Sequence, residues 1–223
     1  MIVDLHAHAA PASGDARMGV RELAEAAAAL GLEAVALTDH GPADLASARR
    51  VLAKNGIALV PGREVSTPLG HVLVLATDEE WLFGLPPRVS LPLPNSRSGP
   101  CALVWAHPAG WRYAGALIPP DPSKGGEHLH AIEALNGERL HQPDGVRLAE
   151  EIAENLELPT TGGSDAHDAR ALGRCLTEVD GAADAASFIE GIAAGGSRAI
   201  LSRTWADARG YDYARSDLTP YLR

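Results

Sequence analysis

Histidines and carboxylates recur along this chain at the ends of short apolar runs. The first run, Ile2-Val3-Asp4-Leu5, closes on His6-Ala7-His8. Residues two apart on a strand share a face, so His6 and His8 project together and can grip a metal ion as a pair. Five similar patches follow: Thr38-Asp39-His40, Gly62-Arg63-Glu64, Gly70-His71, Ala106-His107 and Gly163-Ser164-Asp165-Ala166-His167. The series predicts a single site that holds more than one metal ion.

Each patch also has a purely structural interpretation. Asp39-His40 could be a turn, Glu64 a solvated charge, and His71 or His107 an ordinary buried or surface histidine. The structural interpretation needs all of the patches to coincide independently with the ends of expected strands. The metal hypothesis explains them together.

The elements expected to carry these side chains alternate between β-branched and Ala/Leu-rich stretches. This alternation is typical of βα units around a mostly parallel sheet, in which functional groups lie at the C-terminal ends of strands. Strands are expected to end near His8 and to cover 33–38, 57–60, 71–76, 101–106, 131–135 and 159–163, with helices over about 17–30, 43–54, 144–152 and 183–194.

The expected organisation is one domain over residues 1–223. Four prolines between 78 and 100 break any long element there, which indicates a loop or small cap. The net charge of −10 disfavours a stable complex with nucleic acid. Cys101 and Cys175 are far apart and lack CxxC spacing, which favours reduced thiols in a cytoplasmic protein. No apolar run is long enough to span a membrane.

In these motifs the chain resembles the polymerase and histidinol phosphatase (PHP) superfamily of metal-dependent phosphoesterases. The resemblance extends over nearly the whole chain and includes Leu172-Gly173 after the last motif. It implies a distorted (β/α)7 TIM-like barrel, an α/β fold, with two or three divalent metal ions. Ligands without thiolates suit Mn, Zn or Fe, and the sequence does not choose among them.

The resemblance also implies a set of ligands for each metal. One metal would take His6, His8, Glu64 and Asp165. A second would share Glu64 and add His71 and His107.

A third metal would use His40, His167 and one residue from the loop after His8. Family members usually have Asp or His five or six residues after the second histidine, but here Ser13 and Gly14 stand there. Asp15 follows and could reach the site. It could equally cap a helix that begins near Arg17.

A metal pair of this kind predicts hydrolysis of a small phosphomonoester or nucleotide by a metal-bridging hydroxide, whose water has its pKa lowered to about 7. His40 or His167 could protonate the leaving oxygen, and Asp165 would hold the catalytic metal. Arg170 is the favoured cation for the phosphate among several arginines and lysines. Four polar residues are expected to support the ligands: Asp4 and Asp39 by orienting histidine rings, and Glu133 and Asn136 from a strand.

Two alternatives stay open. An amidohydrolase-type C–N hydrolase also begins with HxH, but it typically needs a lysine on a central strand, and Lys54 and Lys124 both fall outside the expected strands. A non-catalytic metal-binding PHP module is the second alternative, and the nearly complete ligand set argues against it. The expected partner is a small phosphorylated substrate, and the oligomeric state stays open.

Overall fold

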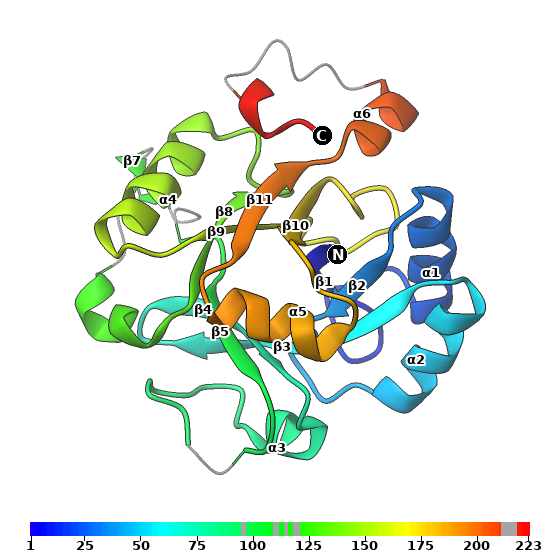
Figure 1. Ribbon diagram of the computed structural model, residues 1–223, viewed down its shortest axis with the longest axis horizontal. Coiled ribbons are helices and arrows are strands. Elements are labelled where there is room, and N and C mark those ends of the chain that lie inside the picture. The colour runs from blue at the N-terminus through cyan, green and yellow to red at the C-terminus, as the bar shows by residue number, and fades with distance from the viewer. Residues whose placement is uncertain (95–96, 109–111, 114–115, 118–120, 211–217) are drawn as a thin grey trace.

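The first strand, β1 (Ile2–Ala7), is third in the order of a nine-stranded sheet in the part of the chain that the structure describes. The structure is a computed structural model, and it describes residues 1–94, 97–108, 112–113, 116–117, 121–210 and 218–223. The strand order is β11-β10-β1-β2-β3-β4-β5-β8-β9. Figure 1 shows the strands arranged in a ring, with helices around it. The predicted α/β class and distorted TIM-like barrel are confirmed.

The helices and strands alternate along the first part of the chain, as the sequence predicts. The strands after β1 are β2 (Ala34–Leu37), β3 (Ala58–Thr67), β4 (Gly70–Ala76), β5 (Cys101–Trp105), β8 (Ala131–Asn136), β9 (Thr160–Gly163), β10 (Cys175–Val179) and β11 (Ser197–Leu201). The helices are α1 (Val20–Ala29), α2 (Leu45–Lys54), α3 (Glu79–Gly84), α4 (Pro143–Asn155), α5 (Ala185–Ala193) and α6 (Arg203–Arg209). Two short strands, β6 (Arg112–Tyr113) and β7 (Ala116–Leu117), pair only with each other.

The sheet is mixed, and its parallel strands are interrupted by a hairpin-like return at β4. β1, β2 and β3 run parallel, as do β5, β8 and β9, but β4 is antiparallel to both of its neighbours. This direction matters for the site, because it places the start of β4 beside the end of β3. β10 and β11, which were not expected from the sequence, extend the sheet beyond β1: β10 pairs antiparallel with β1, and β11 pairs antiparallel with β10.

Side-chain hydroxyls connect the two edges of the sheet and nearly close the ring. The Thr177 hydroxyl of β10 accepts a hydrogen bond from the Gly162 N–H (2.9 Å) and donates to the Gly162 carbonyl (2.7 Å). Ser197 of β11 donates to the carbonyl of Thr160 at 3.2 Å. An added Cβ at Gly162 would lie 2.6 Å from the Leu176 carbonyl oxygen, so this approach requires glycine.

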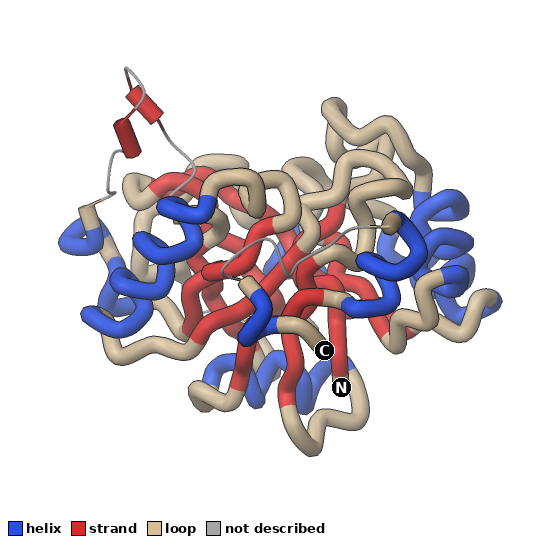
Figure 2. Tube along the Cα trace, turned by 90° about the horizontal axis from the view of Figure 1, so that it is seen from above, coloured by secondary structure: helices blue, strands red, loops and turns tan. Residues whose placement is uncertain are grey.

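Helix α5 closes one end of the barrel. Its buried residues Phe188, Ile189 and Ile192 pack on inward-facing side chains such as Val3 and Leu5 of β1. In Figure 2 this helix lies beneath the strands, while loops gather at the opposite end. Closing one end with apolar side chains leaves the other end for polar groups.

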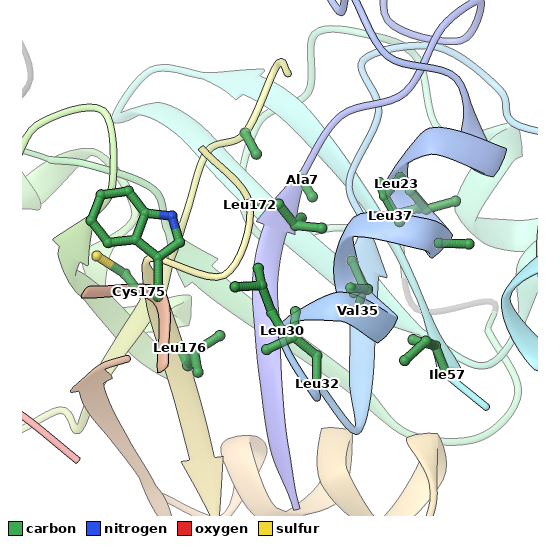
Figure 3. Packing of buried hydrophobic residues seen from close by; sticks show 14 of the residues in the cluster. Ala7, Leu23, Leu30, Leu32, Val35, Leu37, Ile57, Leu172, Cys175 and Leu176 are labelled. Carbon is green, nitrogen blue, oxygen red and sulfur yellow. The ribbon is translucent and has the colours of Figure 1, made fainter. Parts of the chain in front are cut away.

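Helices α1 and α2 cover the outside of β1 and β2. Figure 3 shows Leu23 of α1 beside Leu37 of β2, with Val35 nearby. Burying each such leucine stabilises the fold by about 1.5–3 kcal/mol relative to exposure. α1 begins later than expected, because its N-cap is Gly19 and the Glu22 carboxylate accepts from the Gly19 N–H at 2.9 Å. The alternative in which Asp15 caps this helix is therefore wrong.

The proline-containing segment 78–100 packs on the sheet mainly through leucines. It contains α3, and Leu82, Leu85 and Leu93 are buried against β4 and β5. Gln142 occupies the N-cap position of α4 without a side-chain capping hydrogen bond, and Asp144 lies in the first turn. Among the described residues, no helix is both long and apolar enough to cross a membrane.

Candidate metal centre

The structure brings all the predicted metal ligands together at the end of the barrel opposite α5. Four overlapping groups have ligand atoms within 4.8 Å of one another: His6/His8/Glu64, His6/His107/Asp165, Glu64/His71/His107 and His8/His40/His167. Asp15 lies against two of these histidines. The convergence of residues from 6 to 167 follows from the parallel strands, whose C-terminal ends meet at one rim.

Glu64 is at the centre of these groups, and its two oxygens face different histidines. Oε1 lies 2.7 Å from His71 Nδ1 and 3.2 Å from His107 Nε2. Oε2 lies 3.4 Å from His6 Nε2, from His8 Nε2 and from His40 Nδ1. Glu64 is nearly fully buried within β3, so its strand continues past the expected end.

His71 reaches Glu64 because of the β3–β4 hairpin. It lies at the start of β4 and pairs with Ser66, while Glu64 pairs with Leu73. His71 and Glu64 are therefore diagonal neighbours on the same face of the sheet. The antiparallel return thus brings a ligand at the beginning of a strand to the rim where the parallel strands end.

The inner part of the site is buried. The Nε2 atoms of His6 and His8 are 3.1 Å apart, and Asp165 Oδ1 lies 3.4 and 3.3 Å from them. The side chains of His6 and His8 are 0% and 1% exposed. The backbone fixes this geometry, because the Asp165 N–H donates to the His6 carbonyl (2.8 Å) and the His8 N–H donates to the Ala166 carbonyl (3.0 Å).

The outer part of the site faces solvent. Asp15 Oδ2 lies 3.4 Å from His40 Nε2 and 3.3 Å from His167 Nε2. The side chains of Asp15, His40 and His167 are 54%, 40% and 29% exposed. Since Asp15 does not cap α1, its position favours the ligand interpretation over the capping one.

Backbone conformation at the site is unusual for side-chain-bearing residues. His107 and Asp165 adopt positive φ angles of 33° and 53°. Such conformations cost about 1–3 kcal/mol each and persist where the surrounding structure enforces them, often at functional sites. At Gly163 an added Cβ would lie 2.4 Å from the His6 Cβ and 2.6 Å from Glu133 Oε1. This glycine lets β9 approach the histidine and its carboxylate partner.

Glu133 and Asn136 of β8 form hydrogen bonds with the predicted ligands. Glu133 Oε1 lies 3.0 Å from His6 Nδ1, and its Oε2 accepts from the His107 N–H and from the Asn136 side chain, each at 2.9 Å. Asn136 also donates to Asp165 Oδ2 at 3.2 Å. The expectation that these two residues support the site agrees with this geometry, and the precise role of Glu133 as partner of a histidine ring was not predicted.

Acceptor partners fix which ring nitrogens face the centre. Glu133 can only accept at His6 Nδ1, and the Asp165 carbonyl can only accept at His167 Nδ1 (2.8 Å). These histidines therefore carry a hydrogen on Nδ1 when neutral, and their Nε2 lone pairs are available to a metal ion.

Asp4 and Asp39 do not contact the histidine rings, contrary to expectation. The buried Asp4 carboxylate accepts from the backbone N–H groups of Ser164 (2.9 Å) and Gly173 (2.7 Å), so it ties β1 to the Asp165 loop. Burial raises the pKa of Asp4 to about 6. Asp39 accepts from the Ala9 N–H at 2.7 Å and from the Ser13 hydroxyl at 2.8 Å.

The electrostatics suit cation binding. Burial would raise the pKa values of Glu64 and Asp165, but His6 and the other imidazoles more than offset this and hold both below their usual range. Burial lowers the pKa of His8. Burial also opposes the charged form of His6, yet Asp165, Glu133 and Glu64 outweigh it and raise that pKa well above its usual value.

The donor set fits divalent metal ions. Two imidazole nitrogens at about 2.1 Å from one cation and at right angles to each other would be about 3.0 Å apart, and the Nε2 atoms of His6 and His8 are 3.1 Å apart. Two facing lone pairs at this distance repel each other unless a cation or proton lies between them. The nitrogen and oxygen donors suit Mn, Zn or Fe.

The cations proposed for phosphate binding lie elsewhere or serve the fold. Arg63 is buried and donates to the carbonyls of Leu85 and His40, so it ties loops together. Arg170 is exposed and lines a surface groove with Arg17 and Asp168, and its role in substrate binding stays a prediction. The side chain of Arg112 lies outside the described part of the chain. His130 accepts from the Leu103 N–H at 3.0 Å and does not belong to the ligand groups.

Two protein-family models match the chain. The PHP domain matches residues 4–86, and the PHP-associated model matches residues 145–196. The search of curated proteins gave no match. Every predicted ligand except His107 lies inside one of the two matches: His6, His8, Asp15, His40, Glu64 and His71 in the first, and Asp165 with His167 in the second.

Several solved structures share the fold. PsfC from Pseudomonas syringae PB-5123 is 23% identical, with a TM-score of 0.65 and 94% of each chain covered. A two-domain protein from Bacteroides vulgatus ATCC 8482, containing a predicted PHP-like metal-dependent phosphoesterase, is 18% identical, with a TM-score of 0.59, and the match covers 93% of this chain and 69% of that one. A candidate metal-dependent phosphoesterase from Bifidobacterium adolescentis ATCC 15703 is 17% identical, with a TM-score of 0.56 and coverage of 74% and 87%.

At these identities the structural likeness establishes the fold, and function rests on the site itself. The family matches and the clustered histidines and carboxylates together support a metal-dependent hydrolase. The ordered motifs, the barrel and the two family matches show that this chain belongs to the PHP superfamily.

Proposed function

We propose that the protein is a metal-dependent phosphoesterase that hydrolyses a small phosphomonoester or nucleotide. The observation that carries this proposal is the position of Glu64. One of its oxygens faces His71 and His107, and the other faces His6, His8 and His40. A buried carboxylate placed in this way can bridge two cations, the arrangement that supports in-line displacement at phosphorus.

The bound cations would supply an activated water and neutralise charge on the phosphoryl oxygens. Asp165, beside both His6 and His8, would complete the inner site. His40 and His167 reach the exposed side, where a substrate can approach. They can hold an outer cation together with Asp15, or hold a proton for the leaving oxygen.

The structure offers little support for the C–N hydrolase alternative. Lys54 ends α2 and Lys124 lies in a short 3-10 turn, and both are exposed and outside the site. They are the only lysines in the sequence, so neither provides the central lysine typical of amidohydrolases.

A substrate screen tests the proposal. Protein loaded with Mn, Zn or Fe should release inorganic phosphate from at least one class among sugar phosphates, nucleotides and amino-alcohol phosphates. His6→Ala and Asp165→Ala should abolish the release while leaving the circular dichroism spectrum unchanged. Hydrolysis of amides or cyclic ureides by the loaded protein, without phosphate release from any ester, would reject the phosphoesterase assignment in favour of C–N hydrolysis. Metal binding without hydrolysis of either class would favour the non-catalytic module.

A further inference from the structure

The Ser13 hydroxyl lies at the junction of two ligand groups. Ser13 is fully buried, and its Oγ lies 3.1 Å from His8 Nδ1, 2.8 Å from Asp39 Oδ1 and 3.2 Å from the backbone nitrogen of His40. Its neighbours His8 and Asp39 are also almost inaccessible to solvent. A buried hydroxyl with three polar partners is a strongly constrained group.

The directions of these hydrogen bonds follow from the chemistry of the partners. The Asp39 carboxylate can only accept when ionised, so the single Ser13 proton points to it. The His40 N–H can only donate, so it uses a lone pair of the Ser13 oxygen. The remaining lone pair faces His8 Nδ1, which must therefore carry the hydrogen. The neutral His8 ring then presents a bare Nε2 toward Glu64 and Asp165.

The loop around Ser13 keeps the hydroxyl in place. The Ser13 N–H donates to the Ala9 carbonyl at 3.0 Å, and the Gly41 N–H donates to the Ala12 carbonyl at 3.1 Å. The same turn brings Asp15, two residues later, to His40 and His167. Ser13 thus connects His8, which belongs to an inner and an outer ligand group, with the strand end that carries His40.

We propose that Ser13 is a positioning residue. Its hydroxyl links the Asp39 carboxylate to His8 through two hydrogen bonds and so keeps the hydrogen of the His8 ring on Nδ1. The metal-binding part of this proposal rests on the proposed function. The hydrogen-bond part does not, because the ring form of His8 is a property of the protein without metal.

The test compares Ser13→Ala with the wild-type protein and with Ser13→Thr. Removing the hydroxyl should lower metal affinity about 10- to 100-fold in competition with a chelator, as expected when the partner of a ligating histidine is lost. Histidine side-chain NMR of the metal-free protein should show His8 with its hydrogen on Nδ1 in the wild type and a mixture of ring forms in Ser13→Ala. Ser13→Thr, which keeps the hydroxyl, should restore the wild-type ring form.

Ser197→Ala is a matched control. Ser197 is also buried and donates to a backbone carbonyl, but it lies in β11, away from the ligands. This change should leave metal affinity and His8 unchanged. Unaltered metal affinity and an unaltered His8 ring form in a folded Ser13→Ala protein would overturn the proposal. So would a hydrogen on His8 Nε2 in the metal-free wild type, a result that needs no variant. Absence of phosphatase activity, with the ring form as proposed, would reject only the proposed function.

Discussion

His6 and Glu133 are 127 positions apart in the chain, yet His6 Nδ1 lies 3.0 Å from Glu133 Oε1 in a fully buried pair. The strands that carry them, β1 and β8, are not neighbours in the sheet order, and Gly163 of β9 lies against both residues. Gly163 makes room for their contact, since any side chain there would occupy the same space. The carboxylate turns one nitrogen of His6 away from the centre and leaves the other for a metal ion.

Glu133→Gln should weaken metal binding by about 10- to 100-fold while the protein stays folded. An amide presents an NH2 group to at least one of three donors that the carboxylate now satisfies: the His6 ring, the His107 N–H and the Asn136 side chain. Titration against a chelating dye measures the affinity. Glu127→Gln is the control, because Glu127 is exposed and its carboxylate pairs only with His128 among the described residues. Equal losses in both variants would contradict the assigned role.

Asp15→Ala should remove about one metal ion per chain and leave the others bound. Asp15 is the only carboxylate in the described structure that lies beside both His40 and His167 at the exposed side. Elemental analysis after gel filtration measures the count.

In metal-free Asp15→Ala protein the free energy of unfolding should change by less than about 0.5 kcal/mol. Asp184→Ala should instead cost about 1 kcal/mol, because Asp184 caps α5 through the Ser187 N–H. An unchanged metal count in Asp15→Ala would refute the third ligand set.

Metal affinity should fall as the pH falls. Burial lowers the pKa of His6, but Asp165, Glu133 and Glu64 outweigh burial and raise it well above its usual value. The raised pKa favours a proton on this ring in the metal-free protein, and a metal ion has to displace that proton. Below the raised pKa, affinity should drop by about tenfold per pH unit for each proton released. Calorimetry in two buffers with different ionisation enthalpies counts these protons. Binding without any proton release would show that His6 is neutral in the metal-free protein.

Gly163→Ala should abolish metal binding and destabilise the fold by about 1–3 kcal/mol or more. The added Cβ would lie 2.4 Å from the His6 Cβ and 2.9 Å from the His6 nitrogen, so β9 and β1 must move apart. Urea unfolding and metal titration measure the two effects. Gly84→Ala is the control, since a Cβ added there would meet open space, and Gly84 ends helix α3 away from the ligands. Wild-type behaviour of Gly163→Ala would show that the two strands are less tightly apposed than the structure indicates.

The sequence by itself predicted most of the candidate metal ligands and determined the class of fold. The ligands are recognisable because each follows an apolar run, and parallel strands place such positions at one rim whatever the details of packing. Strand order alone, without knowledge of the loops, was enough to predict six of these residues: His6, His8, His40, His107, Asp165 and His167. The alternation of apolar and Ala/Leu-rich stretches predicted βα units around a sheet, since local patterns reflect which face of each element is buried, and the resemblance to the PHP superfamily supplied the barrel.

The tertiary structure decided what depends on contacts between distant segments. β10 and β11 lack a ligand motif, and their place in the sheet follows from the pairing of β10 with β1, which lies more than 160 residues away in the chain, and of β11 with β10. The sequence alone left two roles open for Asp15, capping a helix or binding a metal. The path of its loop in the folded structure brings it to His40 and His167. Ser13 and Glu133 have no signature of their own, because their roles follow from the ring nitrogens that they meet: Ser13 meets His8 within one loop, and Glu133 meets His6 from a distant strand. Hydrogen bonds of this kind are set by the packing of whole elements, which a local pattern of residues does not encode.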